Sequence, residues 1–427
     1  MSAAIIFGVL LALMLTGMPI SISLGLTVLT FLFTMTHVPL ESVALKLFTG
    51  IEKFEIMAIP FFILAGNFLT HGGVARRMIN FAVSMVGHWH GGLALAGVLA
   101  CALFAAVCGS SVATVVAIGS VLLPEMVKQG FPMKFGAGVV ATAGSLGILM
   151  LPSVVKVVYS VSTNTSIGAL FVAGVVPGLG LAFVLGFVTW YRARKFGYPR
   201  QRKATWGERF KAFRDSAWGL VLVVVVMGGI MSGIFTPTEA AAMSAVYAFF
   251  VAVFVYKDMS MKDVPKVLLN SANMASMLLY IITNAVLFSF IMTNENIPQA
   301  LADWMLGEGL GMVSFLLAVN VLLLIAGNFM EPSSIVLIFA PILFPVAMKL
   351  GIDPVHFGIL MIVNMEIGMC HPPVGLNLYV TSSITKMGIT ELTVAVWPWL
   401  IAMLGFLMLV TYWPAMTLWF PRLVGAM

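Results

Sequence analysis

The sequence contains few charged residues. Of its 427 residues, 9% are Asp, Glu, Lys or Arg and 61% are hydrophobic. Soluble globular domains carry about a quarter charged residues, so this composition excludes a chain that folds mainly in water. At about 20 apolar residues for each membrane crossing, the length provides on the order of ten to twelve spans. It leaves no room for a sizeable soluble catalytic domain.

Cysteine is also scarce, and the motifs of two common chemistries are missing. Cys101, Cys108 and Cys370 fall in apolar segments without the paired spacing of a disulfide framework or a zinc site. The sequence has no glycine-rich loop that ends in Lys-Ser or Lys-Thr, which would bind the phosphates of ATP. Energy for any transport must therefore come from an ion gradient or from a partner.

Positive charge is concentrated in one stretch of the chain. Nine of the 22 Lys and Arg residues lie between Arg192 and Arg214 beside one acid, Glu208. This stretch therefore carries 9 − 1 = +8, and the rest of the chain carries 6 − 8 = −2. A basic segment between apolar runs is typical of a cytoplasmic loop. We therefore predict a cytoplasmic basic linker at 192–217, between a first half at 1–191 and a second half at 218–427.

Each half contains two long apolar segments that glycine, serine and proline interrupt. The interruptions match between the halves, because Ser111 and Ser334 are 223 positions apart and Pro152 and Pro373 are 221 apart. Paired breaks of this kind are the best sequence indication of a transporter site. The pattern predicts an all-α polytopic membrane protein built as an inverted repeat. Its two re-entrant helical hairpins are expected at 92–127 and 312–348, and its two broken spans at 135–162 and 356–384.

The first hairpin tip, in the stretch CGSSVAT, carries three hydroxyl groups. Ser110, Ser111 and Thr114 lie beside carbonyl groups that a helix break frees, and neutral oxygens of this kind suit a dehydrated monovalent cation. The helix start that follows favours an anionic group. Serines at a break also serve as helix caps, so the sequence leaves a binding role and a structural role open.

Charged residues also occur within the apolar segments. Lys156 is the only basic residue between Lys134 and Arg192. A buried ammonium group needs a partner, and it could hold a substrate carboxylate, stand in for a cation at the first site, or pair with Glu366. In the two broken spans, Ser145 aligns with Glu366 and Lys156 aligns with Asn377.

The second hairpin tip adds a carboxylate to the same arrangement. Pro332, Ser333 and Ser334 match the first tip, and Glu331 precedes them. Glu331 is expected either outside the membrane at the tip or as a cation ligand, and a role in ion pairing is an alternative. Glu331 and Glu366 are therefore the candidate ion-coupling carboxylates.

Several long stretches resemble the large membrane subunit of tripartite ATP-independent periplasmic (TRAP) transporters. They are PFFILAGNFL, AGSLGIL, FTPTEAAAMSAVYAFF, GIDPVHFGI and VNMEIGMCHPPVGLNLYV. The resemblance implies an elevator-type transporter in the bacterial inner membrane that imports an organic acid together with sodium. It also implies two partners, a small four-helix membrane subunit and a periplasmic substrate-binding protein, and no cofactor besides the coupling sodium ions.

The resemblance also implies site residues. The sodium region of the family falls on Ser110, Ser111, Thr114, Gly144, Ser145, Pro332, Ser333, Ser334, Pro372 and Pro373. The substrate region falls on Ser111, Ser334 and Asn377. Lys156 is added as a substrate candidate from its own chemistry and not from the resemblance, because its ammonium could hold a substrate carboxylate. The chain departs from the family pattern at Leu151, where a second proline is usual, and at Lys156, where an uncharged residue is usual.

The expected substrate is a four-carbon dicarboxylate such as succinate, malate or fumarate, because the stretches NFMEPSS and MCHPPVGLNLYV are most similar to members that carry these acids. Alternatives are sialic acid or another carboxylate, or a channel or exporter of the same fold that needs no binding protein. An intramembrane enzyme with Ser110 or Ser111 as nucleophile is disfavoured, because no His or Lys base lies beside either serine in its own segment. We therefore do not expect an enzyme.

Overall fold

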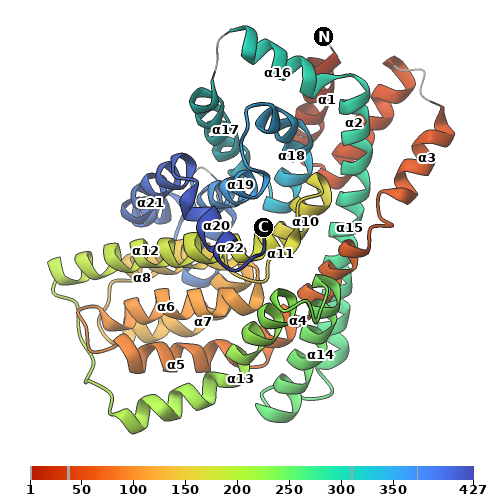
Figure 1. Cartoon of the computed structure of the whole chain (residues 1–427). Helices are drawn as coiled ribbons and strands as arrows, with labels where there is room; N and C mark the ends of the chain where they lie inside the picture. The colour runs from red at the N-terminus through yellow and green to blue at the C-terminus, as the bar shows by residue number, and fades with distance from the viewer. Residues whose placement is uncertain (1, 36–38, 309–310, 373) are drawn as a thin grey trace.

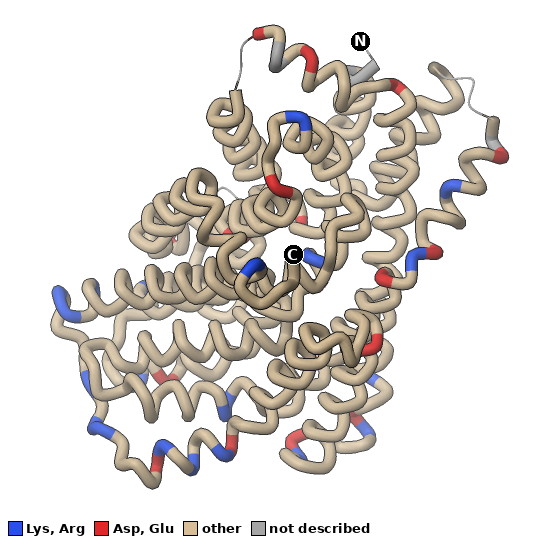
Figure 2. Tube along the Cα trace, in the orientation of Figure 1, with Lys and Arg blue, Asp and Glu red and all other residues tan. Residues whose placement is uncertain are grey.

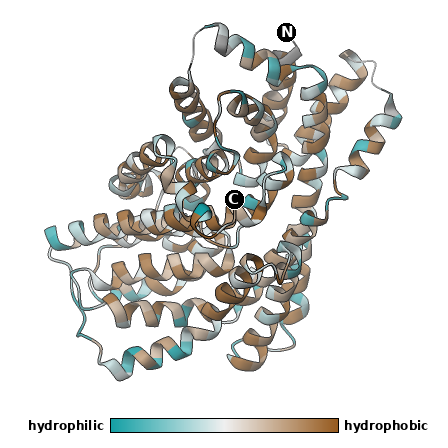
Figure 3. Cartoon of the chain, viewed as in Figure 1, coloured by the Kyte–Doolittle hydropathy of each residue, from teal (hydrophilic) through white to brown (hydrophobic). Residues whose placement is uncertain are grey.

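The computed structural model describes residues 2–35, 39–308, 311–372 and 374–427, and within these ranges the secondary structure is helical throughout (Figure 1). Apolar helices form the bulk of the molecule, and hydrophilic residues gather at helix ends and connections (Figure 3). This arrangement follows from the solvent, because a backbone in hydrocarbon must satisfy its own hydrogen bonds. The prediction of an all-α membrane protein is confirmed.

The first half contains two groups of helices. The leading group is α1 (Ser2–Leu15), α2 (Ile20–Met35), α3 (Leu40–Thr49), the 3-10 helix η1 (Phe54–Met57), α4 (Ala58–His71) and α5 (Val74–Val86). The second group is α6 (Gly92–Cys108), α7 (Ser111–Lys128), α8 (Met133–Gly144), α9 (Leu146–Leu149), α10 (Val154–Thr163), α11 (Ile167–Ala173) and α12 (Val175–Lys195).

The second half follows the same order. Its leading group is α13 (Trp206–Met231), α14 (Pro237–Phe250), the π-helix η2 (Val251–Val255), α15 (Val264–Asn294) and α16 (Ile297–Gly307). Its second group is α17 (Met312–Gly327), α18 (Pro332–Lys349), α19 (Pro354–Gly368), α20 (Leu376–Thr385), α21 (Ile389–Tyr412) and α22 (Ala415–Leu423). The starts of α6 and α17 are 220 residues apart, those of α7 and α18 and of α8 and α19 are 221 apart, and those of α10 and α20 are 222 apart.

The number of helices long enough to cross a membrane is smaller than the chain length allows. Among the described residues, eight helices are long and apolar enough to cross a membrane, and the pair Met133–Leu149 and Val154–Thr163, bent by 42°, makes a ninth. The sequence led us to expect ten to twelve. The difference arises because five further apolar helices among the described residues have 17 residues or fewer, which is short for a full crossing: Ile5–Leu15, Ile20–Met35, Gly92–Cys108, Met312–Gly327 and Pro354–Gly368.

The basic segment is only partly a linker. Helix α12 continues to Lys195 and α13 begins at Trp206, so the non-helical connection covers 196–205. A capping box starts α13, in which Thr205 accepts from the backbone of Glu208 and the Glu208 carboxylate accepts from the backbone of Thr205. Lys and Arg gather along the end of α12, this connection and the start of α13 (Figure 2).

Helices of the two halves pack against one another. Helix α4 lies against α14, α2 against α15, and α10 against α18. In Figure 1, α6, α7, α8 and α12 form a stack on one side, and the long α15 runs down the other. The helix breaks of both halves therefore meet inside one molecule rather than in two separate domains.

Candidate functional site

The first hairpin tip contacts the first helix break directly. The Ser111 hydroxyl donates to the Ser145 carbonyl oxygen at 3.0 Å, and Ser111 is buried. Ser110 is the N-cap of α7 and accepts from the Ala113 amide at 3.4 Å. The Thr114 hydroxyl donates to the Ser110 carbonyl at 2.8 Å. The structural role is therefore present, because Ser110 caps α7 and Ser111 bridges the tip to the break, while a binding role for these hydroxyls stays a prediction.

Glycines allow this close approach. A Cβ atom on Gly147 would lie 2.4 Å from the Ser110 carbonyl carbon and from the Ser111 nitrogen. A Cβ on Gly144 would lie 2.2 Å from a methyl carbon of Val115. Real Cβ atoms do not come this close to backbone atoms, so only glycine fits at Gly147.

The second tip is organised by its carboxylate. Glu331 is the N-cap of α18, where one carboxylate oxygen accepts from the Ser333 hydroxyl at 2.9 Å and the other from the Ser334 amide at 3.3 Å. Pro332 occupies the first turn, where a missing N–H is tolerated. The Ser334 hydroxyl is buried and has no hydrogen-bond partner among the described residues. Glu331 thus acts as a cap at the tip and is only partly exposed.

The carboxylate of the second broken span reaches the break of the first. One oxygen of Glu366 accepts from the amides of Ile148 at 3.1 Å and Leu149 at 2.7 Å. The Lys156 ammonium donates to the Leu149 carbonyl at 2.7 Å. Both side chains are fully buried. Within the described part of the chain, the two do not form an ion pair, so both instead hold the short helix α9.

Asn377 belongs to the same region. Its amide nitrogen donates to the Ala141 carbonyl at 3.3 Å, while its side-chain oxygen is buried without a partner among the described residues. Pro372 lies in the connection between α19 and α20. The predicted site residue Pro373 lies outside the described residues.

The sequence did not identify every polar residue near the breaks. The side-chain oxygen of Asn328, at the second tip, lies 3.1 Å from Nδ1 of His371 in the second break, and the Gly375 amide donates to the Asn328 carbonyl at 3.4 Å. A further buried set joins α17, α19 and α21, where Asn364 donates to Asn320 at 2.9 Å and Asn320 donates to Thr411 at 2.9 Å. Their positions as asparagines inside apolar runs are the sequence signal from which Asn328, Asn320 and Asn364 could have been predicted.

The polar groups near the helix breaks include oxygens that could act as ligands. In addition to Ser334 and Asn377, buried oxygens of Ser153 and Glu366 lack partners among the described residues. Freed carbonyls and neutral oxygens near a break suit a monovalent cation. Within the described ranges, no group of three His, Cys, Asp or Glu side chains could hold a metal ion. The first and second tips are not joined by a hydrogen bond in these ranges, but the two broken spans are, through Glu366 and Asn377.

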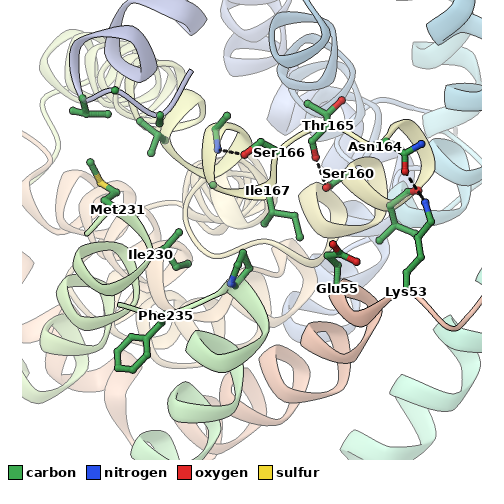
Figure 4. A pocket seen from close by; sticks show the side chains of 18 residues that line it. Lys53, Glu55, Ser160, Asn164, Thr165, Ser166, Ile167, Ile230, Met231 and Phe235 are labelled. Carbon is green, nitrogen blue, oxygen red and sulfur yellow. Dashed lines mark hydrogen bonds between the residues drawn. The ribbon is translucent and has the colours of Figure 1, made fainter. Parts of the chain in front are cut away.

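The hollow shown in Figure 4 lies elsewhere. It has a volume of about 820 Å³, and its described lining includes none of the predicted site residues. At its edge the Lys53 ammonium donates to the Val161 carbonyl at 2.6 Å and to the Asn164 side chain at 2.8 Å. Partial burial lowers the pKa of Lys53, and the nearby Glu55 opposes this effect.

Comparisons with known proteins agree with this architecture. Residues 7–416 match the family described as "Tripartite ATP-independent periplasmic transporter, DctM component". A protein of Rhodobacter capsulatus named "C4-dicarboxylate TRAP transporter large permease protein DctM" is 73% identical over 439 aligned positions that cover 100% of both chains. A protein of the same name from Pseudomonas aeruginosa is 53% identical, with 94% of each chain covered.

A solved structure shows the same fold. The YdaH transporter of Alcanivorax borkumensis superposes with a TM-score of 0.62 over 89% of this chain and 90% of that chain, at 16% sequence identity. Together with the apolar spans, the family match identifies a multi-pass protein of the bacterial inner membrane. The chain belongs to the DctM component family of tripartite ATP-independent periplasmic transporters, as a large permease subunit.

Proposed function

We propose that this permease subunit imports a four-carbon dicarboxylate together with sodium, and that it receives the acid from a periplasmic binding protein. The observation that carries the proposal is the full-length similarity to the Rhodobacter capsulatus protein, which is 73% identical and is named for C4-dicarboxylates. Such similarity extends over both tips and both breaks. Succinate, malate and fumarate are the expected substrates.

The two helix starts at the tips are suited to an anion with two carboxylates. Ser111 begins α7, and Ser334 lies in the first turn of α18. Both helices have 18 residues, and the positive end of each helix dipole lies at its tip. The Ser334 hydroxyl and the Asn377 side chain have hydrogen-bonding capacity left for a ligand. We assign substrate contacts to Ser111, Ser334 and Asn377. Lys156, the fourth candidate, already donates to the Leu149 carbonyl, so we do not include it in this assignment.

Sodium coupling would use the oxygens of the same clusters. Candidate ligands in the first half are carbonyl and hydroxyl oxygens of Ser110, Ser111, Thr114, Gly144 and Ser145. Candidates in the second half are the segment from Pro332 to Ser334, the Pro372–Pro373 connection, and the carboxylates Glu331 and Glu366. The unpartnered buried oxygens support this assignment, because they are poorly satisfied without a ligand.

Contacts at the hairpin ends support the re-entrant course and the inverted repeat. Gln201, in the basic connection, donates its amide to the Gly87 carbonyl just before α6, and its side chain donates to Gln129 just after α7. Both ends of the first hairpin therefore meet the same connection. At the second hairpin, Lys349 at the end of α18 pairs with Asp303 of α16, which precedes α17. An elevator motion of the hairpins and broken spans against the remaining helices is part of this proposal.

The partners are a small four-helix membrane subunit and the binding protein. Long helices expose large apolar side chains, for example Val224 on α13, Val246 on α14 and Leu269 on α15. Such surfaces are covered by lipid or by another membrane subunit.

Uptake of radiolabelled succinate into proteoliposomes tests the proposal. Vesicles would hold this chain and its small partner, with and without the binding protein, under an inward sodium gradient. We expect uptake only when both sodium and the binding protein are present. Uptake of sialic acid instead would change the substrate, and uptake by this chain alone would favour an exporter or channel without a binding protein.

A further inference from the structure

Lys156 occupies a cradle that the fold builds for its ammonium group. The side chain is fully buried in α10 and donates to the Leu149 carbonyl at the end of α9. Gly174 forms the opposite wall, because a Cβ there would lie 2.1 Å from the Lys156 nitrogen and 2.6 Å from the Leu149 oxygen. An alanine at Gly174 would therefore displace the ammonium.

The charge on the other side of α9 is negative and equally fixed. Glu366 binds the amides of Ile148 and Leu149 with one oxygen. The peptide groups at this break are thus held by an anion at their N–H groups and by a cation at a carbonyl. No exchangeable ion is needed to balance the two charges, since both belong to the chain.

The matching position in the second half is different. Asn377 lies 221 positions after Lys156, so each residue comes four positions after its proline, Pro152 or Pro373, although the starts of α10 and α20 are 222 positions apart. Its side-chain oxygen and the Ser334 hydroxyl are both buried without partners among the described residues. Unpartnered oxygens occur at both breaks, since those of Ser153 and Glu366 lie at the first. What differs is that the first break carries its own ammonium, whereas the second has a neutral amide at the matching position.

We propose that the Lys156 ammonium is a tethered substitute for a coupling cation at the break of the first half. This inference rests on the proposed sodium coupling and deepens it. Of the two sets of candidate sodium ligands, only the set at the second break, near Ser334 and Asn377, then binds sodium. The first-half set does not, because the Leu149 carbonyl is already occupied by a positive charge that never leaves. The chain then moves fewer sodium ions in each cycle than a permease with a neutral residue at this position.

The test is thermal unfolding of the purified complex of this chain with its small partner, in sodium chloride and in choline chloride at equal ionic strength. Lys156→Asn places an amide where the second half has one. We expect this variant to be less stable than the wild type in choline chloride and to gain a sodium-induced shift of the unfolding midpoint roughly twofold larger, since a second ion then binds only the folded state. Lys53→Met removes a positive charge outside the break and should keep the wild-type shift.

The reverse substitution supplies a second, independent measurement. Asn377→Lys should bring an ammonium to the second break and remove most of the sodium-induced shift. If Lys156→Asn does not fold in either salt, Asn377→Lys becomes the deciding variant. A sodium-induced shift of its unfolding midpoint as large as that of the wild type overturns the inference. A Lys156→Asn shift equal to that of the wild type also overturns it.

The same data separate this inference from the proposed function. If sodium does not stabilise the wild type, sodium coupling is wrong. Even then, a sodium-induced shift that appears only in Lys156→Asn would support the tethered cation, and its absence would overturn it.

Discussion

At Gly147 the backbone of the first helix break comes closer to the backbone of the first hairpin tip than any side chain would allow. We predict that Gly147→Ala lowers stability by about 1–3 kcal/mol, because the added methyl meets backbone atoms of Ser110 and Ser111 that cannot move aside cheaply. Uptake should fall severalfold. The matched control is Gly186→Ala in α12, where a Cβ would meet nothing within 4 Å. Thermal unfolding and uptake of the two variants check the prediction, and equal behaviour would contradict it.

Alanine substitutions of Ser111 and Ser334 should have different effects on stability but similar effects on transport. Ser111→Ala loses a hydrogen bond to the Ser145 carbonyl, which is worth about 0.5–1.5 kcal/mol of stability. Ser334→Ala removes a buried hydroxyl that has no partner among the described residues, so stability should not fall. Both variants should assemble in the membrane and show reduced sodium-driven uptake.

A serine that bonds only within its own helix supplies the control for both variants. Ser244 is buried and donates to the Ala240 carbonyl. Ser244→Ala should leave uptake near the wild-type rate. Normal sodium-dependent uptake in both Ser111→Ala and Ser334→Ala would remove these residues from the site.

Which residues lie at the breaks could be predicted from the sequence, but which of them touch could not. Ser110, Ser111 and Ser334 were predicted from the local sequence, since a serine at a helix break indicates a helix cap or a ligand-binding residue. The contact of Glu366 with Ile148 joins residues 218 positions apart and depends on how the halves pack. Gly147 was missed because an isolated glycine in an apolar run does not reveal what lies against it.

At the scale of the element, the breaks were easier to place than the short helices. The structure has α6 and α7 at Gly92–Cys108 and Ser111–Lys128, where a hairpin at 92–127 was expected, because Gly and Ser at the tip stop the helix locally. Helices α3 and α9 were not predicted from the sequence. Helix α9 has only four residues and exists because Glu366 binds its amides, which is a tertiary effect.

The connection before η1 is clamped to the end of α10, and we predict that the clamp limits opening there. Lys53→Met removes the donor to Val161 and Asn164 (Figure 4). A cysteine introduced at the buried Thr165 should then react about fivefold faster with a membrane-impermeant thiol reagent, as expected for the loss of roughly 1 kcal/mol at a partly exposed site.

Lys46→Met is the matched control for the clamp. Lys46 lies on the neighbouring α3, with its ammonium 5.5 Å from the centre of the Phe290 ring, and does not reach α10 in the described contacts. Its loss should not change the reactivity of a cysteine at position 165. The three native cysteines are buried, so their background labelling is expected to be low. Equal rates in the Lys53 and Lys46 variants would show that the clamp does not hold this region closed.

At the scale of the molecule, the two halves depend on each other for their cores. Helices α2 and α4 pack against α15 and α14 of the other half, and α10 packs against α18. The order of elements could be predicted from the repeat in the sequence. The pairing between halves could not, because apolar helices of similar composition offer many equivalent partners and packing alone selects among them.

The inverted repeat makes its sharpest prediction at two lysines that end matched helices. Lys128 ends α7 and Lys349 ends α18, 221 positions later. Lys128 neighbours Gln129, which bonds to Gln201 in the basic connection, so positive charge places this end in the cytoplasm. Lys349 pairs with Asp303 on α16, and the inverted repeat places that end outside. Single cysteines at the two positions should therefore differ in intact spheroplasts.

An impermeant thiol reagent added outside should label Lys349→Cys and leave Lys128→Cys unlabelled until the membrane is permeabilised. Lys203→Cys, in the basic connection, is the cytoplasmic control and should behave like Lys128→Cys. A hairpin that returns to its side of entry keeps both of its ends on that side, and an odd number of crossings in the first half reverses the orientation of the second half. Labelling of Lys128→Cys and Lys349→Cys from the same side would mean that the halves are parallel, and the inverted repeat would have to be abandoned.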